Sequence, residues 1–219
     1  MSAQPNLLAF PPAAQPQELV EKYRPRFLSE FCGLSKPKEI LSRLAERPFA
    51  SNWLLVGAPG TGKTTSALAL ASMIPAEVQH IASNELTVDQ INEVHSRCFS
   101  MPMFGHGWWM VLVDEVDTGT EKALDSLLSK LDTTKRAPQT IYVLTCNDDS
   151  KLHPRLVQRC KRLEYSTYGI QEDAVQLLTQ IWAQEAPGKT PPNVARIVKD
   201  AKGSVRAALQ ALEMELMLA

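Results

Sequence analysis

The 219-residue sequence has few cysteines, no long apolar run and almost no net charge. Its four cysteines lie far apart without a C-x-x-C pair, and its four histidines are equally dispersed, so we expect no zinc site. Scattered cysteines fit a reducing, intracellular setting. No apolar run approaches the ~20 residues of a membrane span, and no signal peptide is visible. We therefore expect a cytoplasmic protein with no membrane partner.

The formal net charge of −1 excludes a strongly basic nucleic-acid binder, although an oligomer could still build a local basic face. With 44% apolar residues the chain can fill a core, and 21% charged residues is an ordinary surface. The length is enough for one large domain or two smaller ones.

The clearest motif is the phosphate-binding loop G-A-P-G-T-G-K-T at residues 57–64, between an apolar run at 53–56 and a helical pattern at 65–71. Its glycines permit tight turns, and its N–H groups and the following helix dipole favour a phosphate. Lys63 would reach the β- and γ-phosphates, and Thr64 would ligate Mg²⁺. The alternative is a glycine-rich turn that binds nothing. The predicted nucleotide-binding residues of this stretch are Gly57, Ala58, Pro59, Gly60, Thr61, Gly62, Lys63, Thr64 and Thr65.

A second phosphate motif, D-E-V-D at residues 114–117, follows the continuously apolar run 108–113. Such a run is typical of a parallel strand buried on both faces, and open α/β sheets place ligands at the carboxyl ends of their strands. Asp114 would hold Mg²⁺, directly or through water, and Glu115 would orient the attacking water. Phosphoryl transfer needs both, because it depends on positioning and on neutralising charge. An ordinary acidic turn is the alternative.

A third polar position, Asn147, follows the apolar run 140–145. Its amide could hydrogen-bond the attacking water or the γ-phosphate. Asparagine also ends strands for turn reasons alone, and without the other motifs that simpler interpretation is the better one.

Alternating strand and helix patterns predict an α/β fold, a three-layer αβα sandwich of the P-loop NTPase type with a mainly parallel sheet. After residue 166 only helical patterns remain, so a small C-terminal helical lid domain is expected. The predicted domains are a flexible tail at 1–17, a nucleotide-binding core at 18–166 and the lid at 167–219. Ser83 or Asn84 is expected to cap the helix that includes Val88 and Ile91.

Several motifs occur in an order that resembles the AAA+ ATPases, and most closely the sliding-clamp-loader subunits of the replication factor C type. The phosphate-binding loop alone indicates only an NTPase, whereas E-K-Y-R-P and R-C point to clamp loaders. The resemblance covers about residues 18–219. It rests on 21–25 (E-K-Y-R-P), 57–64, 82–84 (A-S-N), 114–117, 146–147 (C-N), 152–154 (L-H-P) with 159–160 (R-C), and 203–206 (G-S-V-R).

The resemblance implies ATP and Mg²⁺ as ligands and assigns further site residues. Tyr23, Arg24 and Pro25 would border the adenine, and Asn147 would take the sensor 1 position. Arg159 matches the clamp-loader arginine that acts in trans on a neighbour's ATP, and Arg206 matches the sensor 2 arginine of the lid, which reaches the γ-phosphate. Each arginine could instead be a solvated surface charge. Gln158 stands where the family usually has serine, and the nearby Arg155 could compete with Arg159 for its role.

The expected function is ATP hydrolysis by a homo- or hetero-oligomer of AAA+ subunits, coupled to loading or remodelling a partner on DNA. A sliding clamp and primed DNA are the partners that the resemblance implies. Clamp-loader subunits continue into a helical collar, which this sequence is expected to lack. The expectation is then either a reduced loader-like ATPase or an assembly surface supplied by another chain. The alternatives are another AAA+ remodeller, such as a helicase loader or branch-migration motor, and a nucleotide-binding switch or scaffold without turnover.

Overall fold

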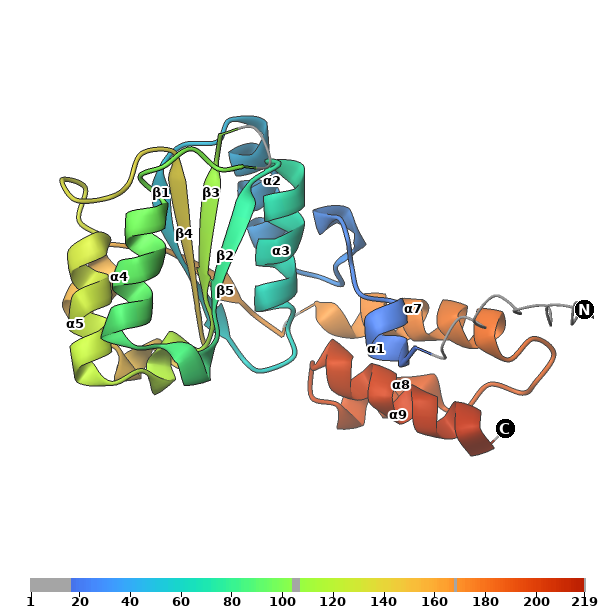
Figure 1. Ribbon diagram of the computed structural model, residues 1–219. Helices are drawn as coiled ribbons and strands as arrows, with labels where there is room; N and C mark the ends of the chain where they lie inside the picture. The colour runs from blue at the N-terminus through green and yellow to red at the C-terminus, as the bar shows by residue number, and fades with distance from the viewer. Residues whose placement is uncertain (1–16, 104–106, 168, 219) are drawn as a thin grey trace, which may run out of the picture.

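A computed structural model describes residues 17–103, 107–167 and 169–218, so the expected tail falls almost wholly outside the described residues. The centre of the fold is a parallel sheet in the order β2-β3-β4-β1-β5 (Figure 1). Its strands are β1 (Ser51–Gly57), β2 (Glu77–Ile81), β3 (Trp109–Val113), β4 (Thr140–Cys146) and β5 (Lys161–Tyr165).

Helices cover both faces of this sheet, which confirms the predicted αβα sandwich (Figure 1). Leu55, Leu112 and Val143 pack toward α2 and α3, while Leu54 and Leu144 pack toward the other helices. The central strands are buried along their whole length, which explains their continuously apolar sequences. The helices are α2 (Ser35–Glu46) and α3 (Lys63–Met73) on one face, and α4 (Val88–Arg97), α5 (Glu121–Lys130) and α6 (Pro154–Gln158) on the other.

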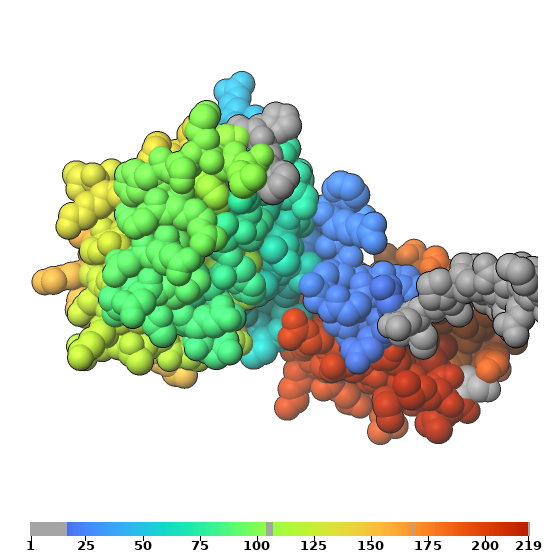
Figure 2. Space-filling model, viewed as in Figure 1, coloured from blue at the N-terminus to red at the C-terminus, as the bar shows by residue number. Residues whose placement is uncertain are grey.

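A helical lobe lies beside the sheet (Figures 1 and 2). It consists of α7 (Ile170–Glu185), α8 (Val194–Asp200) and α9 (Val205–Leu218), which pack against one another. Leu178, Ile181 and Leu212 are buried between them, in an apolar cluster that continues to the α3 face of the sheet. Among the described helices, none combines the length and apolar character needed to cross a membrane.

The first helix, α1 (Leu19–Lys22), packs against α9 of the helical lobe and not on the sheet (Figure 1). The Leu19 N–H donates a hydrogen bond to Glu213 Oε1 at 3.0 Å, and Lys22 pairs with Glu185 at 2.7 Å. The expected core range of 18–166 therefore begins with a segment that contacts the lid. The chain then reaches α2 through the 3₁₀ turn η1 (Leu28–Glu30).

The expected cap of α4 is wrong, because residues 83–85 form a separate 3₁₀ turn, η2 (Ser83–Glu85). The helix begins after it, and the Thr87 hydroxyl accepts a hydrogen bond from the Gln90 N–H at 3.2 Å. Two further 3₁₀ turns, η3 (Val116–Thr118) and η4 (Asp149–Lys151), follow β3 and β4.

Candidate active site

Three of the predicted site segments meet at the carboxyl edge of the sheet. The phosphate-binding loop follows β1, Asp114 follows β3, and Asn147 follows β4, the strand that lies between the other two. The register aligns Val56 with Cys146 and Val113 with Leu144, so the three strands end at nearly the same level. Their polar side chains converge as a result.

The loop wraps around the side chain of Lys63. Gly60 and Gly62 have φ values of 76° and 91°, a left-handed region that glycine enters without strain. The loop carbonyls then turn inward, and the Lys63 ammonium donates to the carbonyls of Gly57 at 2.7 Å and Ala58 at 3.0 Å. The Thr61 hydroxyl also donates to the Ala58 carbonyl, at 2.8 Å. Pro59 lies exposed at the outer turn of this loop.

Lys63 also contacts the neighbouring strand end, where its ammonium donates to Asn147 Oδ1 at 3.0 Å. Burial lowers the pKa of Lys63, against the opposing effect of the carboxylates at the edge of the sheet. Lys63 is thus an almost buried cation surrounded by carbonyl oxygens. It lies close to where a phosphate bound by the loop would be.

Asp114 is the centre of a hydrogen-bond cluster. Its Oδ1 accepts from the Thr64 hydroxyl at 2.7 Å and the Thr145 hydroxyl at 3.0 Å, and its Oδ2 lies 2.7 Å from His80 Nε2. The structure thus brings the two predicted magnesium ligands together from α3 and β3. Sequence reasoning missed Thr145 and His80. Their positions at the ends of β4 and β2 were the available signal, because those ends share the edge with Asp114.

The Thr64 hydroxyl and the Asp114 carboxylate fit Mg²⁺, which prefers oxygen ligands and usually takes only one or two of them from protein. Among the residues that the structure describes, no group of three or more His, Cys, Asp or Glu side chains could hold a metal ion. A site that shares its ion with substrate phosphates does not need such a group.

Glu115 lies beside this cluster with its side chain exposed. Its φ of 48° is unusual for a residue other than glycine. Its N–H donates to the Thr145 hydroxyl at 3.0 Å, which holds the turn in place. The backbone thus turns immediately after β3, and the carboxylate is exposed next to Asp114.

A cavity of about 400 Å³ opens next to the loop, between the sheet and the helical lobe. One wall is formed by the predicted adenine-bordering residues Tyr23, Arg24 and Pro25. Loop and α3 residues form the floor, and Arg206 comes from α9. Sequence reasoning missed the apolar lining, because it comes from elements distant in sequence. This lining includes Phe31, Val205, Leu177 and Leu209, and the floor is Gly60, Thr61, Gly62 and Thr65.

Tyr23 ties this wall to the helical lobe. Its hydroxyl donates to Glu185 at the end of α7, where Lys22 also pairs, and lies 3.1 Å from Gln184 Oε1. Burial, and then the hydrogen bond to Glu185, raises the pKa of Tyr23 to about 12. The segment 23–25 is therefore anchored to the lid and faces the loop.

The start of α9 packs directly on the phosphate-binding loop. A Cβ atom at Gly60 would lie 2.1 Å from Ser204 Oγ and 3.5 Å from the Arg206 Cβ, so only glycine fits there. This contact places Arg206 beside the loop and at the cavity wall. A long, exposed guanidinium at this position can reach a phosphate in the loop.

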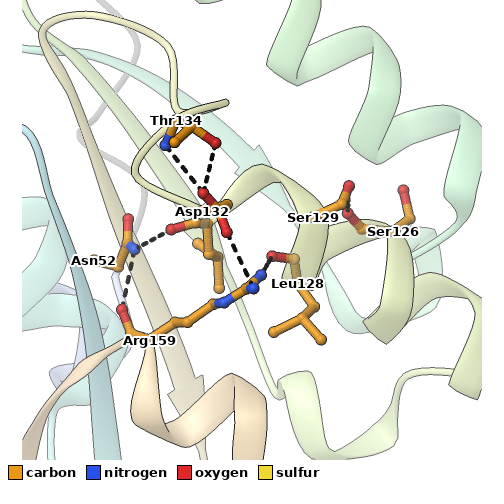
Figure 3. A network of polar contacts seen from close by, with 8 residues as sticks. Asn52, Ser126, Leu128, Ser129, Asp132, Thr134 and Arg159 are labelled. Atoms are coloured by element: carbon orange, nitrogen blue, oxygen red, sulfur yellow. Dashed lines mark hydrogen bonds and ion pairs between the residues drawn. The ribbon is translucent and has the colours of Figure 1, made fainter.

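Arg159 lies elsewhere, at the amino end of β1 (Figure 3). Its guanidinium donates to the Leu128 carbonyl at 2.5 Å and pairs with Asp132 at 3.1 Å. Its own carbonyl accepts from Asn52 Nδ2 at 3.1 Å. Gly57 lies five residue steps along the strand from Asn52, roughly 17 Å at the usual rise of a strand. The structure thus does not bring Arg159 to the phosphate-binding loop of its own chain.

Comparison with known proteins agrees with this geometry. Residues 53–168 match the family described as "ATPase family associated with various cellular activities (AAA)". Replication factor C subunit 3 of Blastobotrys adeninivorans is 29% identical over 202 residues, which are 89% of this chain and 59% of that protein. The replication factor C small subunit of Methanococcus maripaludis strain C7 is 30% identical over 201 residues, 89% of this chain and 63% of that one. The chain thus spans less than two thirds of these relatives.

Among solved structures, a single-residue variant of Thermotoga maritima RuvB superposes with a TM-score of 0.74 at 21% identity, covering 90% of this chain and 65% of that one. The structure titled RuvB Holliday junction branch migration motor, from the same organism, gives a TM-score of 0.71 at 22% identity, with the same coverage. At this identity the likeness concerns the fold alone. More than half of the length of this chain matches the family, the loop and the lid line one cavity, and Asp114 is hydrogen-bonded to Thr64 at the end of that loop. The chain therefore belongs to the AAA family of ATPases and resembles its clamp-loader subunits.

Proposed function

We propose that this chain binds Mg-ATP and hydrolyses it as one subunit of a clamp-loader-like AAA+ assembly. The observation that carries the proposal is the hydrogen bond between the Thr64 hydroxyl and Asp114 Oδ1 at 2.7 Å. It brings two oxygen ligands from separate elements to the place where the loop would present the β- and γ-phosphates. A bound Mg²⁺ would neutralise phosphate charge there.

Different residues of the chain would bind the nucleotide and position the attacking water. Lys63 and the loop N–H groups would bind phosphates, and the cavity beside Tyr23 and Pro25 would take the base. Glu115 would orient and polarise the attacking water, since its carboxylate is exposed next to Asp114. Asn147 already contacts Lys63 and would help to hold that water or the γ-phosphate. Catalysis of this kind consists mainly of positioning and charge stabilisation.

Arg159 would complete the site of a neighbouring subunit. Its position at the amino end of β1 supports this role, because its side chain is too far from its own loop to serve it. Arg206 would act within its own chain, from the lid. An oligomer of AAA+ subunits, of one or several kinds, is therefore part of the proposal.

The proposed load is a partner on DNA, with a sliding clamp and primed DNA as the candidates. Similarity to replication factor C subunits of 29–30% identity and the E-K-Y-R-P motif support this choice. Measuring the ATPase rate with and without primed DNA tests it. Stimulation by primed DNA would agree with the proposal, and an absence of any turnover would favour the nucleotide-binding scaffold.

A mixing experiment tests the trans role of Arg159. Arg159→Ala should bind ATP and hydrolyse it poorly. Lys63→Ala should fail to bind ATP in its own pocket but keep an intact Arg159, called the finger here because it would reach the ATP of a neighbouring subunit. Mixing the two should restore activity, because some interfaces then pair an intact pocket with an intact finger. The comparison variant is Arg155→Ala, which removes the exposed arginine of α6 that could compete with Arg159 for this role. No recovery despite co-assembly, confirmed by size-exclusion chromatography, would contradict the role of Arg159.

A further inference from the structure

Arg159 is held at three points by residues that the ATPase motifs do not include, namely Asn52, Asp132 and the carbonyl of Leu128 (Figure 3). Asn52, the second residue of β1, donates from Nδ2 to the Arg159 carbonyl at 3.1 Å and to the Leu131 carbonyl at 2.8 Å. Asp132 forms an ion pair with the guanidinium at 3.1 Å. The Asn52 contact fixes the backbone of Arg159, and Asp132, together with the Leu128 carbonyl, fixes the end of its side chain.

The Asn52 contact has an energetic cost, because it buries a polar oxygen of the side chain. The side chain is 4% exposed, and its Oδ1 is buried with no hydrogen-bond partner among the described residues. The orientation of the amide is nevertheless determined, because two carbonyl oxygens face it and only its NH₂ group can satisfy them. A residue kept for packing alone would not carry an unpaired buried oxygen. What Asn52 achieves instead is to join the end of α5, the start of β1 and the backbone of Arg159.

Asp132 is itself fixed before it contacts the guanidinium. Its Oδ1 accepts from the Thr134 N–H at 3.0 Å and from the Thr134 hydroxyl at 2.7 Å. These two bonds, with the nearby charge of Arg159 as a smaller cause, lower the pKa of Asp132. The carboxylate is therefore ionised at neutral pH and held through Oδ1 by Thr134.

These contacts leave most N–H donors of the Arg159 guanidinium available to a ligand. A guanidinium has five N–H donors; the Leu128 carbonyl accepts one from Nη1, and Asp132 forms an ion pair at Nη2. Among the contacts of the described residues, at least three donors remain for a phosphate. The side chain is 36% exposed, so these donors can be reached from outside the chain.

From this arrangement we propose that Asn52 and Asp132 are positioning residues for Arg159. They hold it, before assembly, in the orientation in which it meets the nucleotide of a neighbouring subunit. The inference rests on the proposed trans role of Arg159 and goes further, by naming the residues that make it effective. Preorganisation matters here because an error of about 1 Å in a catalytic group can cost on the order of 100-fold in rate.

The test compares the effect of one substitution when it is placed in either of the two chains of a mixed assembly. The reference is the mixture of Lys63→Ala, which donates the finger, with Arg159→Ala, which offers the pocket. Asn52→Ser is then added either to the donor chain or to the pocket chain. We expect kcat to fall about 10- to 100-fold when the finger donor carries it, with an unchanged KM for ATP. The loss should be at least tenfold smaller when the pocket chain carries it.

A merely structural role would predict equal losses in both placements, and that result would overturn the inference. If the reference mixture shows no activity, the trans role itself fails, and the inference fails with it. If Asn52→Ser does not fold, Asp132→Asn decides, because it lies at a partly exposed site and keeps an acceptor for Thr134. Its matched control is Asp125→Asn, an exposed carboxylate on α5.

Asp132→Asn also shows whether the contact with Asp132 helps or hinders the action of Arg159 on the neighbouring subunit. Positioning predicts a slower donor chain, about tenfold or more. A faster donor chain would mean that Asp132 withholds Arg159 from the neighbour, and would overturn the proposal.

Discussion

The Lys63 ammonium and the Asn147 side chain are joined by a hydrogen bond of 3.0 Å between Nζ and Oδ1. This bond links the phosphate-binding loop to the end of β4, across the edge where β1 and β4 lie side by side. The lysine is thus held by the loop and by the adjacent strand. An entering phosphate would replace loop carbonyls as its partner.

Lys63→Ala is expected to weaken ATP binding at least 100-fold while the fold is kept. The side chain faces the phosphate position and not the apolar core, so its removal opens little apolar cavity. Fluorescence titration with a labelled ATP analogue measures the affinity, and circular dichroism monitors the fold. The matched control is Lys122→Ala, an exposed lysine on α5. Unchanged affinity in Lys63→Ala would contradict the assignment of the loop.

Glu115→Gln should separate binding from turnover. Asp114 and Thr64 remain, so Mg-ATP affinity should stay within about threefold. Hydrolysis should fall by at least two orders of magnitude, the typical lower contribution of a general base. ATP-bound assemblies should then persist during size-exclusion chromatography. A near wild-type rate would show that another group orients the water.

Arg206→Ala should reduce affinity for ATP more than affinity for ADP, because its guanidinium is expected to reach the γ-phosphate. A charge-assisted contact is worth about 1.5–3 kcal/mol, which corresponds to roughly 10- to 150-fold in affinity. Calorimetric titration with both nucleotides measures the difference. Arg196→Ala, on the neighbouring α8 and strongly exposed, is the control. Equal losses for ATP and ADP would remove Arg206 from the γ-phosphate.

Stability should decrease above pH 9 because of two buried thiols. Burial raises the pKa of Cys98 and of Cys146 to about 12 each, from an ordinary value of 9.0. The unfolded chain therefore releases these protons at lower pH than the folded chain, so the free energy of unfolding falls as pH rises from about 9 toward 12. The slope is at most about 1.4 kcal/mol per pH unit for each thiol. Urea unfolding at pH 8 and pH 10, with reductant, measures the change, and Cys98→Ala should reduce it.

The elements and the fold class were predictable because they depend on local spacing. The glycines around Lys63 and the apolar run before Asp114 specify a loop and a buried strand within a few residues of sequence. The packing of α1 on α9 was not predictable, because nothing in a four-residue helix indicates a partner nearly 200 residues later. The contact of His80 with Asp114 was only partly predictable, because the strand-end position of His80 is visible in the sequence but the pairing of β2 with β3 is not.

The assignment of Ser83 or Asn84 as a helix cap failed for a related reason. Both residues have suitable side chains, but the short turn that they form ends before α4 begins at Val88. Propensity identifies residues that are able to cap a helix, whereas the path of the chain after β2 decides which one does so.

Lys63 and Arg159 lie at opposite ends of β1, so the ATP site and the arginine that would act on a neighbour occupy different surfaces of the subunit. If one end of a subunit completes the pocket of the next, the contact joins two different surfaces, so copies associate head to tail and not around a twofold axis. An open row would always keep one pocket without a finger and one finger without a pocket. Only closure into a ring gives every subunit a complete site, so the ratio of active sites to subunits reports whether the assembly is open or closed.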